Sequence, residues 1–188
     1  MSGFPCFAAV LGLMLEVLLA SPAFAGSPRV GSTAADFTLK TPGGDPIRLA
    51  TIKEKGPVVL VVLRGWPGYQ CPLCTRQVGE LIGKSKEFQA SQAQVLLVYP
   101  GPAENLKGHA EEFVQGKSLP DNFTLVVDPD FGFTKSYDLR WEAPGETAYP
   151  STFVIDRQGK IVFAKTSRSH GDRAKVAVVL QALKKVDH

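Results

Sequence analysis

The stretch VVLVVLRGWPGYQCPLC, residues 58–74, joins a continuous apolar run, 58–63, to a helix that we expect to begin at Pro72. Continuous apolar runs are typical of strands that are buried on both faces of a parallel sheet. Proline suits the first position of a helix, because its fixed φ is already helical and its missing N–H is not needed there. The stretch therefore predicts a strand, a loop and a helix with Cys71 at its N-terminus.

Cys71 and Cys74 are the only cysteines beyond residue 25. Free N–H groups and the positive end of the helix dipole stabilise a thiolate at a helix N-terminus, where the pKa of cysteine falls from about 8.5 to roughly 3.5–7.5. Cys74 is one turn further along the same helix face, within reach of an oxidised Cys71. The spacing predicts a redox-active pair, with Cys71 as the nucleophile and Cys74 as the resolving thiol.

A Cys-x-x-Cys pair can also be half of a zinc site or a purely structural disulfide. A structural zinc site needs four ligands, and His109, His170 and His188 do not stand at the spacing of such sites. A disulfide across so short a loop gives little of the entropic stabilisation that long loops give. Both alternatives stay open, and the residues favour the redox pair.

A leader precedes the domain. Residues 7–20 are apolar except for Glu16, and residues 23–25 give the small-x-small pattern that signal peptidase reads. We therefore expect residues 1–25 to be an export signal, with one domain over 26–188 in the periplasm or another extracytoplasmic compartment. The membrane is then involved only through this signal, and an uncleaved anchor is the alternative.

Composition narrows the class of protein further. The formal net charge of +3 is small, and no basic run with interleaved aromatic residues is present, so the sequence does not indicate nucleic-acid binding. An exported protein that keeps a single cysteine pair is unlike a disulfide-stabilised scaffold, which would be rich in cysteine. A redox protein fits this composition better.

The hydrophobic pattern predicts an N-terminal hairpin, two crossovers, a C-terminal hairpin and a final helix. The expected hairpins pair strands 36–40 with 46–49 and 152–155 with 161–164, and the expected buried strands are 58–63, 94–99 and 124–127. Three helices are expected: one whose apolar face is Val78, Leu81, Ile82 and Phe88, one over 103–114, and a final one whose apolar face is Val176, Val179, Leu180 and Leu183. A right-handed crossover places Cys71 at the carboxyl end of the first buried strand, where open α/β sheets carry their sites.

This order of elements resembles the thioredoxin fold, and local strings resemble the alkyl hydroperoxide reductase/thiol-specific antioxidant (peroxiredoxin) superfamily. The strings are ADFTL at 35–39, VVLVVL at 58–63, CPLC at 71–74, PSTFVID at 150–156 and GDR at 171–173. The resemblance implies an α/β, three-layer thioredoxin-like fold with a central mixed sheet and an N-terminal hairpin extension.

The resemblance also implies residues that shape a substrate groove. Pro150 falls where thioredoxin-like proteins place a cis-proline facing the Cys-x-x-Cys pair, and an ordinary trans proline is the alternative. Trp66 and Tyr69 would form an apolar lip beside the Cys71 sulfur, unless they are simply core residues.

Two arginines are implied as catalytic. Arg173 falls where peroxiredoxins carry an arginine before the last helix, and its guanidinium would lower the thiol pKa and polarise a peroxide O–O bond. Arg64, just after the buried strand, is a second candidate for the same role. A solvated arginine is the alternative for both.

The sequence departs from the peroxiredoxin pattern Pro-x-x-x-Thr-x-x-Cys, because Arg64 and Gly68 occupy the Pro and Thr positions. Two oxidoreductases therefore remain: a peroxiredoxin-like peroxidase, which is preferred, and a thiol-disulfide oxidoreductase that acts on protein disulfides. Either needs an external dithiol reductant protein, and neither needs a cofactor or metal.

A third reading is a copper-binding module of the Sco type, in which His170 or His109 would supply a nitrogen ligand. That family has three residues between its cysteines, whereas this chain has two.

Overall fold

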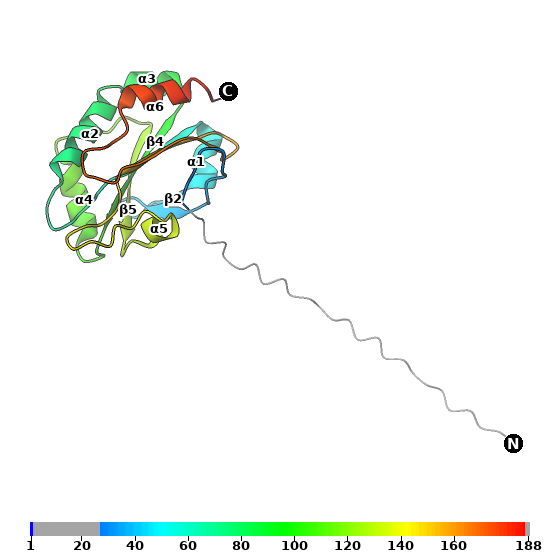
Figure 1. Cartoon of the computed structure of the whole chain (residues 1–188), viewed down its shortest axis with the longest axis horizontal. Helices are drawn as coiled ribbons and strands as arrows, with labels where there is room; N and C mark the ends of the chain where they lie inside the picture. The colour runs from blue at the N-terminus through cyan, green and yellow to red at the C-terminus, as the bar shows by residue number, and fades with distance from the viewer. Residues whose placement is uncertain (2–26, 187–188) are drawn as a thin grey trace.

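A seven-stranded sheet forms the middle of the protein in the computed structural model, which describes Met1 and residues 27–186 (Figure 1). The strands are β1 Thr38–Lys40, β2 Pro46–Arg48, β3 Val58–Val62, β4 Gln94–Gly101, β5 Phe123–Pro129, β6 Ser151–Ile155 and β7 Ile161–Thr166, in the order β2-β1-β5-β4-β3-β6-β7. Strands β3, β4 and β5 are parallel to one another. The β1-β2 hairpin, β6 and β7 pair antiparallel with their neighbours. The expected mixed sheet with an N-terminal hairpin is confirmed.

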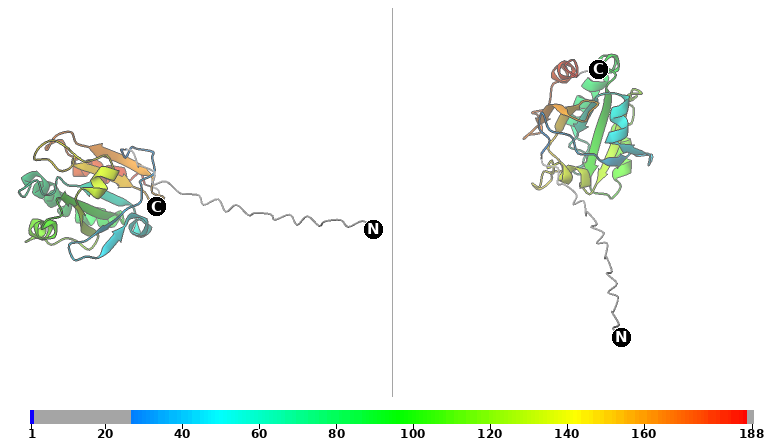
Figure 2. Two further views of the ribbon diagram at one scale, coloured as in Figure 1. Left: turned by 90° about the horizontal axis from the view of Figure 1, so that it is seen from below. Right: turned by 90° about the vertical axis from the view of Figure 1, so that its right-hand side faces the viewer.

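Helices lie on both sides of the sheet, as the two views of Figure 2 show. They are α1 Leu49–Lys55, α2 Pro72–Ile82, α3 Ser85–Ala90, α4 Leu106–Val114, α5 Gly132–Ser136 and α6 Val176–Leu183. Along β3, Val59 and Val61 pack under α2, α3, α4 and α6, while Leu60 and Val62 pack under α1 and α5. This alternation follows from the two-residue period of a strand, and it gives the three-layer arrangement that the family resemblance implies.

The helix expected between the first two buried strands is two helices, α2 and α3. The helix ends at Gly83, and Lys84 has a non-helical backbone with φ −112° and ψ 18°. Glycine is about 1 kcal/mol less favourable than alanine inside a helix, so ending the helix at Gly83 costs little free energy. Phe88 of α3 still packs in the same core layer as Val78 of α2, so the predicted apolar face is preserved.

Helices α1 and α5 are not anticipated by the sequence pattern. Helix α1 buries only Leu49 and Ile52, which is too few positions to show a period. Helix α5 begins after the buried carboxylate of Asp128, which accepts the backbone N–H groups of Phe133 at 2.7 Å and Thr134 at 3.0 Å. A tertiary contact from β5, rather than local propensity, therefore stabilises this short helix.

The carboxyl ends of the three parallel strands share one edge of the sheet, and the loop from β3 to α2 begins there. Gly65 in this loop has φ +69°, and a Cβ at this position would lie 1.9 Å from the carbonyl oxygen of Pro100. Only glycine fits so close to β4 with a left-handed backbone. This passage brings the chain to Cys71 and the start of α2.

The expected export signal, residues 1–25, falls outside the described residues except for Met1. Among the described residues, no helix is both long enough and apolar enough to cross a membrane.

Candidate active site

Cys71 is the N-cap residue of α2, and Pro72 is the first residue of the helix. The Cys71 carbonyl accepts the N–H groups of Cys74 at 3.0 Å and Thr75 at 3.1 Å, which closes the first turn. Both cysteines are free thiols, and they are 3% and 0% exposed. The predicted placement of the pair at a helix N-terminus is confirmed.

Arg173 lies against both sulfur atoms. Its Nη2 is 3.9 Å from the Cys71 Sγ and 3.5 Å from the Cys74 Sγ. The rest of the guanidinium is fixed, because Nη1 donates to the Oε1 of Gln77 at 2.5 Å and Nε donates to the carbonyl of His170 at 2.8 Å. The structure thus brings Arg173 to the place where the sequence predicts it, while its catalytic role stays a prediction.

The two thiols differ in acidity. A hydrogen bond from the Cys74 thiol lowers the pKa of Cys71 to about 5, and the Cys74 backbone N–H and the charge of Arg173 act in the same direction against the effect of burial. The same hydrogen bond, together with burial, raises the pKa of Cys74 well above its usual value. At neutral pH the pair therefore consists of a Cys71 thiolate and a protonated Cys74 thiol.

Arg64 takes part in the site through its backbone. Its N–H donates to the Cys74 Sγ at 3.3 Å. Its guanidinium donates to Glu146 and to the Gly145 carbonyl, both at 2.8 Å, and to the Tyr69 hydroxyl. Among the contacts of the described residues, this guanidinium touches neither sulfur, so the expectation of a second arginine over the thiols is not met.

Strand alternation explains the direction of the Arg64 side chain. Leu63 faces the core layer that contains the cysteines. Alternation continued just beyond the end of β3 turns the next side chain toward the opposite side, where Leu139 and Ala148 of the loop 139–149 pack. Glu146 of that loop gives the buried guanidinium an anionic partner.

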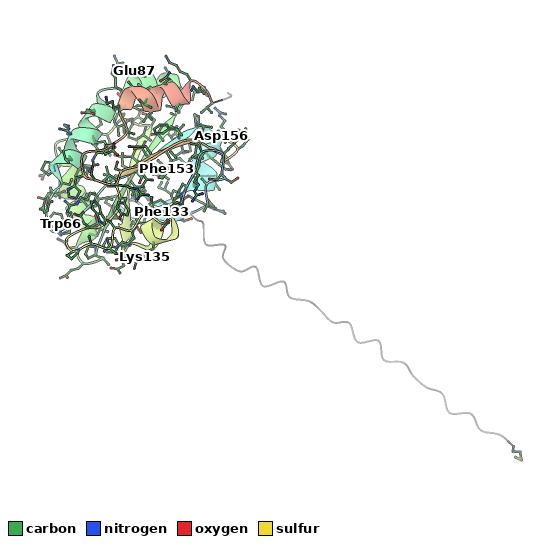
Figure 3. The ribbon with its side chains drawn as sticks, viewed as in Figure 1. Trp66, Glu87, Phe133, Lys135, Phe153 and Asp156 are labelled. Carbon is green, nitrogen blue, oxygen red and sulfur yellow. The ribbon has the colours of Figure 1, made fainter. Side chains whose placement is uncertain are left out.

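Trp66 and Tyr69 flank the pair in different ways. Trp66, which is labelled in Figure 3, is half-buried and packs against the core cluster that includes Cys71. It stacks on His109 of α4 with ring centroids 3.6 Å apart. Tyr69 is 50% exposed, and the Arg64 guanidinium carbon lies 5.2 Å from its ring centroid. Trp66 is therefore partly a core residue and Tyr69 is exposed, while their role as a lip beside the Cys71 sulfur stays a prediction.

The cis peptide bond expected at Pro150 is not found, because every peptide bond among the described residues is trans. Pro150 is buried, and its carbonyl accepts the N–H of Ser167 at 2.9 Å. The next residue, Ser151, already pairs with Val62 in the sheet. The trans bond keeps the chain extended as it enters β6, so this feature of the resemblance does not carry over.

Sequence reasoning misses Gln77 and Glu146. Gln77 lies three residues after Cys74, so helical spacing alone could have placed it on the face of the thiols. Glu146 lies in a loop without any periodic pattern, and only the tertiary structure brings it to Arg64.

Among residues 27–186, no group of three or more His, Cys, Asp or Glu side chains is placed to hold a metal ion. The two histidines considered as copper ligands have other contacts. His109 stacks on Trp66, and the Nε2 of His170 lies 2.9 Å from the Oε1 of Glu146.

The chain is similar to several known proteins. The model of the AhpC/TSA family matches residues 30–164. The chain is 29% identical to the chloroplastic peroxiredoxin Q of Sedum lineare, over 70% of this chain and 65% of the relative. It is 32% identical to the thiol-disulfide oxidoreductase ResA of Geobacillus thermodenitrificans, over 70% of this chain and 66% of the relative. The aligned part is thus slightly less than two thirds of the length of these relatives.

Solved structures show the same fold. The crystal structure of peroxidoxin BcpB from Mycobacterium tuberculosis superposes with a TM-score of 0.68 at 24% identity, covering 86% of this chain and 99% of that chain. The likeness confirms the thioredoxin-like fold.

Proposed function

Since the chain belongs to the AhpC/TSA family, we propose that it is a thiol-dependent oxidoreductase that reduces peroxides through Cys71. One observation carries this proposal: the guanidinium of Arg173 lies over a buried Cys71 of lowered pKa and a protonated Cys74. A thiolate is the nucleophilic form of cysteine, and a fixed cation beside it stabilises negative charge that develops on a leaving oxygen.

The proposed reaction has two steps. The Cys71 thiolate attacks one peroxide oxygen, the O–O bond breaks, and the other oxygen leaves as water or an alcohol after taking a proton. Sulfur is oxidised by two electrons to a sulfenic acid. The sulfur of Cys74 then attacks the Cys71 sulfur, an S–S bond forms, and the sulfenic hydroxyl leaves as water with the proton that Cys74 gives up.

Burial of the nucleophile supports a small oxidant. Cys71 is only 3% exposed, the Arg173 guanidinium lies 3.9 Å from its sulfur, and Trp66 packs against the same core cluster. A peroxide needs access to a single atom, whereas a protein disulfide must bring a polypeptide segment into line with the sulfur. The burial of the Cys71 sulfur therefore favours the smaller substrate, a peroxide.

The second candidate is a thiol-disulfide oxidoreductase, and two observations favour it. The chain is 32% identical to ResA over the aligned region. Gly68 also stands where peroxiredoxins carry the threonine that binds peroxide. On this reading the Cys71 thiolate attacks a protein disulfide and forms a mixed disulfide, which Cys74 resolves.

In either reaction an external dithiol protein returns the pair to the reduced state, since the described residues contain no third cysteine. We also propose that the domain works outside the cytoplasm. The apolar stretch 7–20 and the cleavage pattern at 23–25 support this location.

Peroxide titration with mass spectrometry tests the two-step scheme. One equivalent of hydrogen peroxide should convert the reduced protein into a single species that has lost two hydrogen atoms and contains a Cys71–Cys74 disulfide. Cys74→Ser should instead stop after the first step and gain one oxygen on Cys71. Two free thiols in the wild-type protein after this treatment would contradict the scheme.

A further inference from the structure

The carboxylate of Glu146 lies between the two loops that contact the cysteine pair. Its Oε2 accepts from the Nε of Arg64 at 2.8 Å, and its Oε1 lies 2.9 Å from the Nε2 of His170. The side chain of Glu146 is 12% exposed, and that of Arg64 is 5% exposed. This largely buried carboxylate thus uses a different oxygen for each loop.

The first loop is held at Arg64 in two ways. Glu146 binds the guanidinium, and the hydroxyl of Thr147 donates to the Arg64 carbonyl. The backbone N–H of the same residue, Arg64, donates to the Cys74 Sγ. Glu146 and Thr147, which are adjacent in one loop, therefore hold the residue whose N–H contacts the resolving sulfur.

The second loop is held at His170. Glu146 binds its ring, and its carbonyl accepts the Nε of Arg173, whose Nη2 reaches both sulfurs. Glu146 is thus connected to the thiols through His170, whose carbonyl accepts a hydrogen bond from the Arg173 guanidinium.

We propose that Glu146 is a positioning residue, which sets the thiol chemistry by holding the Arg64 peptide and the Arg173 guanidinium against the sulfurs. The inference rests on the proposed thiol function and adds a residue to it. Glu146 itself does not touch either sulfur among the described contacts, so it acts through its two partners.

Positioning and simple charge predict opposite results. A carboxylate near a thiolate, acting only by its charge, raises the thiol pKa, so removing it would lower that pKa. A carboxylate that holds Arg173 beside the sulfurs lowers the thiol pKa, so a side chain too short to contact both partners would raise that pKa. The sign of the change therefore distinguishes the two.

Two conservative variants separate reach from charge. Glu146→Asp keeps the charge and shortens the side chain by one methylene, so it cannot bind both partners in the present geometry. Glu146→Gln keeps the reach and removes the charge, and its amide can accept from Arg64 and donate to His170. Glu142→Asp is the matched control, because Glu142 is in the same loop and its side chain is 75% exposed.

The measurement is the rate of Cys71 alkylation as a function of pH in the reduced protein. In the wild type the rate should be half-maximal at about pH 5, and it should fall below that pH as the thiolate is protonated. In Glu146→Asp the midpoint should rise by about one unit, which slows alkylation at pH 5 several-fold, since a cation next to a thiolate shifts its pKa by roughly one to three units. Glu146→Gln and Glu142→Asp should stay close to the wild type.

Thermal unfolding of the same variants separates positioning from stability. Glu146→Gln leaves the buried Arg64 without a counter-charge, so it should lower Tm more than Glu146→Asp does. A merely structural Glu146 would move Tm without moving the alkylation midpoint.

An unchanged midpoint in Glu146→Asp, or a lowered midpoint in Glu146→Gln, would overturn the proposal. Alkylation does not need peroxide turnover, so the outcome is independent of the oxidant. A raised midpoint in a protein that fails to reduce peroxide would leave the positioning role intact and reject the proposed peroxidase.

Discussion

Cys71→Ser should abolish peroxide reduction, with a loss on the order of 10,000-fold or more, because no other group at the site can act as the nucleophile. The serine hydroxyl has the same shape but is not ionised at neutral pH. Cys74 cannot replace Cys71, because its side chain is completely buried: the variant loses the hydrogen bond to Cys71 that raises the pKa of Cys74, but burial still raises that pKa and keeps the sulfur from the oxidant. The expected result is an absence of any fast phase in stopped-flow peroxide consumption.

Cys74→Ser is the matched control for this loss, since it should retain the first turnover and lose the following ones. Both variants should keep the fold, because serine is smaller than cysteine and each site is in the first turn of α2. If Cys71→Ser still consumes peroxide at the wild-type rate while Cys74→Ser does not, the roles of the two cysteines are reversed.

Arg173→Ala should slow peroxide reduction by about 10- to 1,000-fold, the range for removing one group that stabilises charge in a transition state. Its Nη2 is within 3.9 Å of both sulfurs, so the variant should also raise the pKa of Cys71. Reduction of a protein disulfide should fall much less, because that reaction places no charge on a departing peroxide oxygen. Stopped-flow rates with each oxidant, measured above the thiol pKa, separate the two effects.

Arg168→Ala is the control for Arg173→Ala, because Arg168 is an exposed arginine in the same loop. It should leave both rates unchanged. If Arg173→Ala slows neither reaction above the thiol pKa, this arginine serves only to lower that pKa. Equal slowing of peroxide and disulfide reduction at such a pH would also show that the assigned role in O–O cleavage is wrong.

The sequence predicts the parts of the site that are local. The apolar run of β3, the proline at the start of α2 and the cysteine spacing all lie within 17 consecutive residues, 58–74, and short-range geometry places them. The hairpins and the terminal helix follow from periodic patterns in the same way. Helices α1 and α5 are too short to show a period, so their formation depends on tertiary contacts.

The direction of side chains and the loop contacts are predicted less well. Arg64 is adjacent to the site along the chain, but strand alternation turns its guanidinium toward Glu146. Pro150 directly precedes β6 with a trans bond, because position in a fold does not fix the peptide isomer. Glu146 is 75 residues beyond Cys71, in an irregular loop, and no local rule connects the two.

The most direct test of the account is a stopped-flow comparison of the reduced wild-type protein with hydrogen peroxide and with a protein disulfide, using free cysteine as the reference thiol. The account predicts that peroxide oxidises Cys71 at least about 100-fold faster than it oxidises free cysteine at the same pH, since one charge-stabilising group is worth roughly that factor. It also predicts that the protein disulfide is reduced more slowly. A reaction with peroxide no faster than that of free cysteine, together with rapid reduction of the protein disulfide, would contradict the peroxidase and establish the thiol-disulfide oxidoreductase in its place.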